Sequence, residues 1–168
     1  LQMAPAAVSL IGEILDDKSL NLKSNPAVTR LRKRIEESNT TSPFVPNTLN
    51  AQLRDYQEEG FEWLSKVTSW GAGVCLADDM GLGKTIQILS AIAAIRHAKA
   101  ARTGPILVVA PTSVVAVWME QAARFAPDLR VRAVTETEAR RGTSIEEEVD
   151  GADLVITSYT LVRLESDQ

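Results

Sequence analysis

A short glycine-containing segment constrains the fold of this chain more than any other feature. Residues 81–85 (GLGKT) follow the apolar run 73–77 after three residues and open the apolar stretch 84–97. An apolar run, a glycine bend and an apolar helix in this order predict a strand–turn–helix unit. Such a bend presents free backbone amides at the positive end of a helix, where an anion is attracted.

The residues of this bend suit the phosphates of a nucleotide that carries magnesium. Lys84 offers a cation to the β- and γ-phosphates, and the hydroxyl of Thr85 is a ligand for Mg²⁺. The generic pattern G-x-x-x-x-G-K-[ST] is not fully matched, because Asp78 occupies its first glycine position. The position between an apolar strand and an apolar helix favours a phosphate-binding loop, and the alternative is a glycine-rich turn with a surface lysine.

The chain after Gly71 alternates between strand-like and helix-like segments. We expect strands at 73–77, 105–110, 131–134 and 153–157, and helices at 84–97, at 113–125 and within 135–149. Strands of continuous apolar residues separated by helices predict an α/β fold with a parallel sheet covered on both faces.

Two regions precede this alternation. Residues 49–70 are predicted to form one amphipathic helix. Residues 1–48 are predicted to be the helical tail of a preceding domain with a linker at 38–46, and Asn25 followed by Pro26 marks a helix start. The basic cluster at 30–34 either contacts nucleic acid or forms a solvated helix face.

Composition limits the class of protein. With 168 residues, 45% hydrophobic and 24% charged, the chain suits one soluble globular domain, and no run reaches the roughly 18 apolar residues of a membrane helix. The net charge of -4 argues against strong sequence-independent binding of DNA by this chain alone. Its single cysteine, Cys75, is expected on a buried strand and cannot form a disulfide within the chain, which favours a reducing compartment such as the cytoplasm. No secretory signal is recognisable, and the start at Leu1 suggests a piece of a longer chain.

Four segments resemble one particular family. Residues 76–85 (LADDMGLGKT) resemble the ATP-binding motif of Swi/Snf-type ATPases, a branch of the superfamily 2 helicase-like motors. Residues 53–57 (LRDYQ) resemble the adenine-recognition motif of that family, 110–113 (APTS) its second motif and 156–159 (ITSY) its third. Two positions depart from the family pattern, since Asp55 replaces a usual proline and Val117 a common asparagine.

The resemblance implies a fold and a set of site residues. The fold would be the N-terminal part of a first RecA-like lobe at 49–168. This part would end before the strand that carries the Walker B acidic pair. Gln57 would read the adenine edge, while Arg54 would lie near the base or pair with an acid. The phosphates and Mg²⁺ would be bound by Asp79, Met80, Gly81, Leu82, Gly83, Lys84 and Thr85. Nucleic-acid phosphates would be bound by Thr112, Ser113, Thr157 and Ser158, for which helix capping is the alternative role.

The same resemblance implies a function and its limits. The parent protein would be an ATP-dependent translocase or remodeller that acts on duplex DNA through two RecA-like lobes. The alternatives are a strand-separating helicase of RNA or DNA and a non-catalytic interaction module. Because the acidic pair and the arginines of the second lobe are missing, we expect this chain to bind ATP weakly without turnover. We expect it to be monomeric, away from membranes and cytoplasmic, with the nucleoid or the nucleus as the site in a bacterium or a eukaryote.

Overall fold

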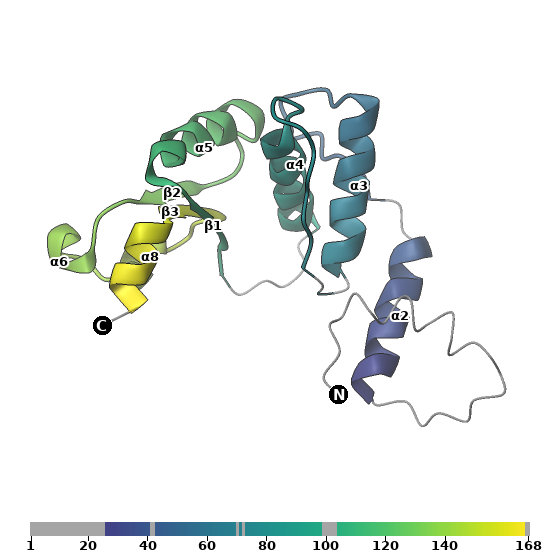
Figure 1. Ribbon diagram of the computed structural model, residues 1–168, viewed down its shortest axis with the longest axis horizontal. Helices are drawn as coiled ribbons and strands as arrows, with labels where there is room; N and C mark the ends of the chain where they lie inside the picture. The colour runs from purple at the N-terminus through teal and green to yellow at the C-terminus, as the bar shows by residue number, and fades with distance from the viewer. Residues whose placement is uncertain (1–25, 41–42, 70, 72, 99–103, 167–168) are drawn as a thin grey trace. The chain divides into compact units, whose positions relative to one another are not determined.

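The computed structural model describes residues 26–40, 43–69, 71, 73–98 and 104–166 (Figure 1). The chain divides into two compact units. Unit 1 comprises Leu1–Pro43 and Glu62–Ala77, and unit 2 comprises Phe44–Phe61 and Asp78–Gln168. The predicted phosphate loop and every strand that the structure describes therefore belong to unit 2.

A three-stranded parallel sheet lies at the centre of unit 2. Its strands β1 (Ile106–Ala110), β2 (Val131–Val134) and β3 (Leu154–Ser158) are arranged in the order β1-β3-β2. All five residues of the central strand β3 are buried, whereas the two outer strands are partly exposed. Continuous apolar sequence thus corresponds to a strand covered on both faces, and the predicted parallel α/β architecture is confirmed.

The side chains of β3 alternate between two apolar clusters. Leu154 and Ile156 pack with residues of α4 (Lys84–His97) and α5 (Thr112–Phe125) on one face. Val155, on the other face, packs with Leu161 of α8 (Tyr159–Ser166). This alternation follows from the two-residue period of a strand, and it places helices on both faces of the sheet (Figure 1).

The polar segment after β2 forms two short helices. They are α6 (Glu138–Arg141) and α7 (Ile145–Val149), and Ser144 caps α7 by accepting a hydrogen bond of 3.2 Å from the amide of Glu147. Three acidic residues, Glu146, Glu147 and Glu148, occupy the first turn of α7, where the positive end of the helix favours them.

The predicted strand at 73–77 is wrong for the described structure. These residues are non-helical and unpaired with any strand that the structure describes, and a parallel strand persists only when a neighbour accepts its backbone hydrogen bonds. The predicted burial of Cys75 is wrong for the same reason, since its side chain is exposed.

The helix observed in the region 49–70 is shorter than the predicted one. In the structure, α3 covers Asp55–Ser69. The six residues before it turn instead, because the amide of Leu49 donates to the carbonyl of Pro46 and the amide of Asn50 to that of Phe125. Leu49 and Leu53 are both buried in this turn, so the apolar spacing of the helix continues there without helical structure.

Unit 1 contains α2 (Pro26–Thr40), whose start was predicted from Pro26. The helix extends three residues into the predicted linker at 38–46, and residues 1–25 lie outside the described part of the chain. On α2, Lys33 pairs with Glu37 at 3.7 Å, so the basic cluster is mixed with acidic side chains.

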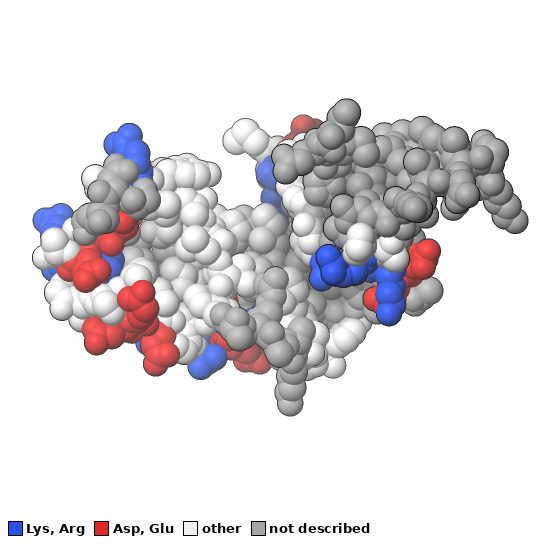
Figure 2. Space-filling model, turned by 90° about the horizontal axis from the view of Figure 1, so that it is seen from below, with Lys and Arg blue, Asp and Glu red and all other residues white. Residues whose placement is uncertain are grey.

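Charges of both signs are also mixed on the part of unit 2 that carries α6 and α8, at the left of Figure 2. At this end of the view, basic and acidic side chains lie next to one another. Within the described residues, every helix is too short or too polar to cross a lipid bilayer.

Candidate nucleotide-binding site

The predicted phosphate loop is a left-handed bend at the start of α4. Gly81 has φ 87° and Gly83 has φ 79°, a region in which side chains are strained. Gly83 is the N-cap of α4 and contributes no side-chain hydrogen bond. The first amides of this 14-residue helix are therefore available to a ligand, and the positive end of the helix dipole favours an anion at the bend.

The ammonium group of Lys84 lies over the beginning of the loop. Its Nζ donates to the backbone carbonyls of Asp78 and Asp79, both at 2.8 Å. None of the ion pairs among the described residues involves Lys84. Neutral carbonyls leave the charge of the ammonium uncompensated, so a phosphate group can replace them with a charge-assisted hydrogen bond.

Gln57 connects the first turn of α3 with the loop. Its Oε1 accepts a hydrogen bond of 3.0 Å from the amide of Arg54, the residue before α3, and its Nε2 donates to the carbonyl of Leu82 at 3.2 Å. A glutamine that accepts a hydrogen bond from the backbone amide of the residue before its helix forms half of a capping box. The side chain is buried, whereas that of Arg54 is exposed.

A cavity of about 340 Å³ adjoins this contact. Gln57 and Gly83 form one wall, and α5 supplies much of the remainder. Its full lining is Gln57, Gly83, Ile86, Glu120, Gln121, Arg124 and Phe125. The structure therefore brings the predicted adenine-binding glutamine and the phosphate loop to one hollow of unit 2.

Thr85 and the tip of the loop differ in exposure. Thr85 is half-buried in the first turn of α4, and its hydroxyl is free of hydrogen bonds to the described residues. Met80 is 96% exposed at the tip. Within the described part of the chain, no three His, Cys, Asp or Glu side chains converge as metal ligands. The residues present thus fit a Mg²⁺ ion that is held mainly by nucleotide oxygens, with Thr85 as a protein ligand.

One polar residue next to the loop was not predicted from the sequence. Gln87 is completely buried on α4, one turn after Lys84, and its Nε2 donates to Oδ2 of Asp78 at 3.1 Å. Its Oε1 points at Gly60 of α3, where an added Cβ would lie only 1.9 Å away. The signal for this contact was the glycine inside a predicted helix, since such a glycine often permits close packing.

The two residues predicted to contact nucleic acid after β1 lie on the surface. Thr112 and Ser113 are exposed and form the first two positions of α5. Pro111, the N-cap, provides no side-chain hydrogen bond, and the amide of Val114 donates to its carbonyl at 2.8 Å. Both residues are therefore accessible to a ligand at the start of α5.

The corresponding pair, the last two residues of β3, is buried. Thr157 Oγ1 donates to the carbonyl of Val134 at 2.8 Å, and Ser158 Oγ accepts from the amide of Leu161 at 3.2 Å. The first bond ties β3 to β2, and the second caps α8, which is the capping alternative stated for this pair. The structure thus engages both hydroxyls within unit 2.

An ion-pair network lies at the other end of β3. Asp153 binds Arg96 at 2.9 Å and Arg130 at 3.1 Å, and its carboxylate also accepts from the amide of Arg130 at 2.9 Å. The hydrogen bond from the Arg130 side chain is the main cause that lowers the pKa of Asp153, and partial burial opposes it. Arg96 comes from α4, so the network connects that helix to the start of β3.

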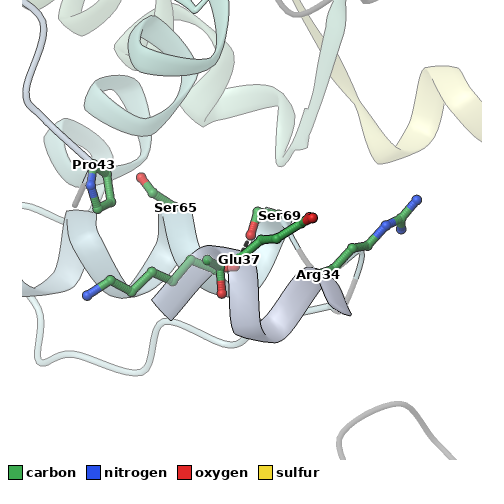
Figure 3. Close-up of a pocket in the computed structure, with 7 residues that line it drawn as sticks. Arg34, Glu37, Pro43, Ser65 and Ser69 are labelled. Atoms are coloured by element: carbon green, nitrogen blue, oxygen red, sulfur yellow. Dashed lines mark hydrogen bonds between the residues drawn. The ribbon is translucent and has the colours of Figure 1, made fainter. Parts of the chain in front are cut away.

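Two further hollows are distinct from the phosphate loop. One, of about 570 Å³ in unit 2, is mostly apolar and lies between β1, α7 and α8. The other, of about 290 Å³, lies between α2 and the second half of α3 in unit 1 (Figure 3). Ser65 and Ser69 line it from α3, while Arg34 and Glu37 of α2 bring opposite charges. None of the predicted nucleotide-binding residues lines either hollow.

Comparison with known proteins gives consistent matches. The SNF2-related domain family matches residues 56–168. The putative ATP-dependent helicase/translocase YwqA of Bacillus subtilis is 36% identical over 138 residues, which are 82% of this chain and 15% of that protein. Helicase SWR1 of Mycosarcoma maydis is 41% identical over 84% of this chain and 7% of its own length.

A solved structure agrees with these sequence matches. The Sulfolobus solfataricus SWI2/SNF2 ATPase core in complex with dsDNA superposes with a TM-score of 0.59 at 34% identity. The match covers 73% of this chain and 24% of that core. The chain thus spans a small part of each of the proteins that it matches.

Proposed function

Because the chain belongs to the SNF2-related domain family, we propose that it is the ATP-binding part of an ATP-dependent motor that moves along duplex DNA. The observation that carries the proposal is the arrangement of Lys84. Its ammonium group rests on two backbone carbonyls beside a left-handed glycine bend, with no carboxylate of the described residues as a competitor for its charge.

The phosphates would bind at the start of α4. The free amides after Gly83 and the helix dipole stabilise the β-phosphate, and Lys84 moves from the carbonyls of Asp78 and Asp79 to the β- and γ-phosphates. Mg²⁺ neutralises phosphate charge when it is bound, and the hydroxyl of Thr85, which has no hydrogen bond to the described residues, would be its ligand from this chain.

The adenine base would bind in the cavity beside Gln57. The carboxamide can accept a second hydrogen bond at Oε1, since each carbonyl oxygen has two lone pairs. Its Nε2 also lies 3.5 Å from the hydroxyl oxygen of Tyr56, a long contact that a base edge can replace. A volume of about 340 Å³ is at the lower end of that of small-molecule sites.

DNA would be contacted from the start of α5. Thr112 and Ser113 are exposed there with free amides, a combination that binds backbone phosphate without reading sequence. Contacts of Thr157 and Ser158 with DNA remain a prediction, for which their hydroxyls would have to exchange internal hydrogen bonds.

Nucleotide binding is tested with the variant Lys84→Ala. Amide NMR shifts of this chain are followed during titration with Mg-ATP up to millimolar concentration. We expect shifts centred on residues 81–85 in the wild type and an affinity lower by roughly tenfold or more in the variant, because a charge-assisted hydrogen bond is lost.

The matched control for this titration is Lys66→Ala. Lys66 is a lysine of α3 that pairs with Glu62 at 3.5 Å, and it is absent from the loop. The control should bind Mg-ATP as the wild type does. A wild-type chain without shifts at the loop would contradict the proposal and favour a non-catalytic interaction module.

A translocase is favoured over a strand-separating helicase by the solved core, which is described as bound to double-stranded DNA. The two functions differ in their product, since a translocase leaves the duplex intact. An unwinding assay of the parent protein discriminates between them, and ATP-dependent release of a labelled strand would establish the helicase.

A further inference from the structure

The contact between Gln87 and the head of the phosphate loop lies outside the generic motif. That motif ends at Thr85, two residues earlier. We propose that Gln87 is a positioning residue for nucleotide binding, which fixes Asp78 while Lys84 exchanges its loop carbonyls for phosphate. The inference rests on the proposed nucleotide binding and identifies a residue on which it depends.

Asp78 is held from two sides in the structure. Its backbone carbonyl accepts from Lys84 Nζ at 2.8 Å, and its carboxylate accepts from Gln87 Nε2 at 3.1 Å. When Lys84 moves to a phosphate, the first of these bonds is lost. The bond from Gln87 then remains as the side-chain contact that keeps Asp78 in place.

The charge of Asp78 makes this contact consequential. A carboxylate at the head of a loop that binds a triphosphate repels the ligand, whereas the glycine of the generic pattern has no charge there. The Gln87 amide directs its N–H dipole at Oδ2 and so stabilises the carboxylate beside α4.

The surroundings of Gln87 explain why its amide cannot move away. The side chain is fully buried, and its Oε1 points at the backbone of Gly60, which it approaches because glycine has no side chain. No described residue donates a hydrogen bond to Oε1, and a Cβ at Gly60 would occupy the space that this atom takes. The orientation of the carboxamide is thus set by packing against α3.

The test exchanges the donor and the acceptor of this hydrogen bond. Gln87→Glu places a second carboxylate against Asp78, and we expect Mg-ATP to bind this chain roughly tenfold more weakly, as measured by amide NMR titration. Adding Asp78→Asn restores a donor facing an acceptor, and the double variant should recover to within about threefold of the wild type.

Controls separate positioning from stability. Ser90→Ala changes another fully buried polar residue of α4. The hydroxyl of Ser90 donates a hydrogen bond of 2.7 Å to the carbonyl of Ile86 and none to the loop residues 78–85. This variant should bind Mg-ATP as the wild type does. The unfolding temperature without nucleotide is measured for every variant, and under the proposal the order of affinities does not follow the order of these temperatures.

Each outcome decides the proposal. Equal affinity of Gln87→Glu and the wild type, or a double variant that binds no better than Gln87→Glu, would overturn it while leaving nucleotide binding intact. Absence of binding by the wild type would overturn both. If Gln87→Glu does not fold, Gln87→Met removes the amide without adding charge, and unchanged affinity in that variant would overturn the proposal instead.

Discussion

Gly81 and Gly83 both bend the backbone into the left-handed region, but an added side chain would meet different surroundings at each. At Gly81 a Cβ would touch none of the described residues within 4 Å, whereas at Gly83 it would lie 2.5 Å from Gln57 Nε2 and 3.2 Å from Ile86. Glycine is therefore required at Gly81 by the conformation alone and at Gly83 by space as well.

We expect Gly83→Ala to weaken both folding and nucleotide binding. The left-handed conformation alone costs an alanine roughly 1–2 kcal/mol, and the displaced Gln57 would lose its bond to Leu82. Gly81→Ala should lose only the conformational part. Thermal unfolding and Mg-ATP titration of the two variants measure the difference.

Gly142→Ala is the matched control for these variants. Gly142 has φ 74° with open space around it and ends α6, far along the chain from the loop. It should lower the unfolding temperature about as much as Gly81→Ala and leave Mg-ATP affinity unchanged. Stronger nucleotide binding by Gly83→Ala than by Gly81→Ala would contradict the role assigned to Gln57.

The sequence predicted the site where a local motif specified it. The glycine bend and the helix start at Lys84 are observed, because both depend on neighbouring residues, while the binding roles of residues 81–85 and of Gln57 stay predictions. The role of Gln87 was not predictable from a local pattern, since it depends on the space at Gly60 of another helix. Burial of Thr157 and Ser158 likewise follows from the central position of β3.

At the scale of elements, long apolar segments were predicted well. The helix at 84–97 and the strand at 131–134 have the predicted bounds, and β1, β3 and α5 differ by one residue at one or both ends. One error falls at 73–77, where the apolar pattern predicts a strand but no described strand pairs with it. The other falls at the start of α3, where the capping bond from the amide of Arg54 to Gln57 sets the first residue of the helix. Helix α8 was not predicted, because its eight residues are half polar and its cap is the buried Ser158.

The ion pairs of Asp153 with Arg96 and Arg130 connect α4 to the start of β3, and their strength depends on pH. Arg130 and Arg96 favour the charged carboxylate, so the pKa of Asp153 lies below its ordinary value of about 3.9. The carboxylate of Asp153 therefore stabilises the folded state fully at pH values above its pKa in the unfolded chain. This stabilisation is lost as the pH falls through its lower pKa in the folded protein. We expect Asp153→Asn to reduce the free energy of unfolding by on the order of 1 kcal/mol at pH 7.

The difference between wild type and Asp153→Asn should disappear as the pH is lowered from about 4 toward the folded pKa. Denaturant unfolding across this window measures it. Glu62→Gln is the control, since the Glu62–Lys66 pair is more exposed and contributes little. A difference that persists unchanged in acid would show that the asparagine acts through packing instead of charge.

At the scale of the whole molecule, the predicted family and fold are confirmed. The SNF2-related domain family covers residues 56–168, and the parallel sheet matches a SWI2/SNF2 ATPase core. The match covers 24% of that core. Because the net charge of this chain is -4, strong sequence-independent DNA binding by this chain alone is not expected.

Turnover of ATP needs groups in addition to a phosphate loop. Phosphoryl transfer to water needs a carboxylate that orients the water and an arginine at the γ-phosphate, and Asp153 is already paired with two arginines at the start of β3. We therefore expect no duplex-stimulated phosphate release from this chain, measured with and without DNA at saturating Mg-ATP. The parent protein should show stimulation that Lys84→Ala abolishes. Stimulated release from the isolated chain that disappears in Lys84→Ala would show that these residues contain a complete hydrolytic site.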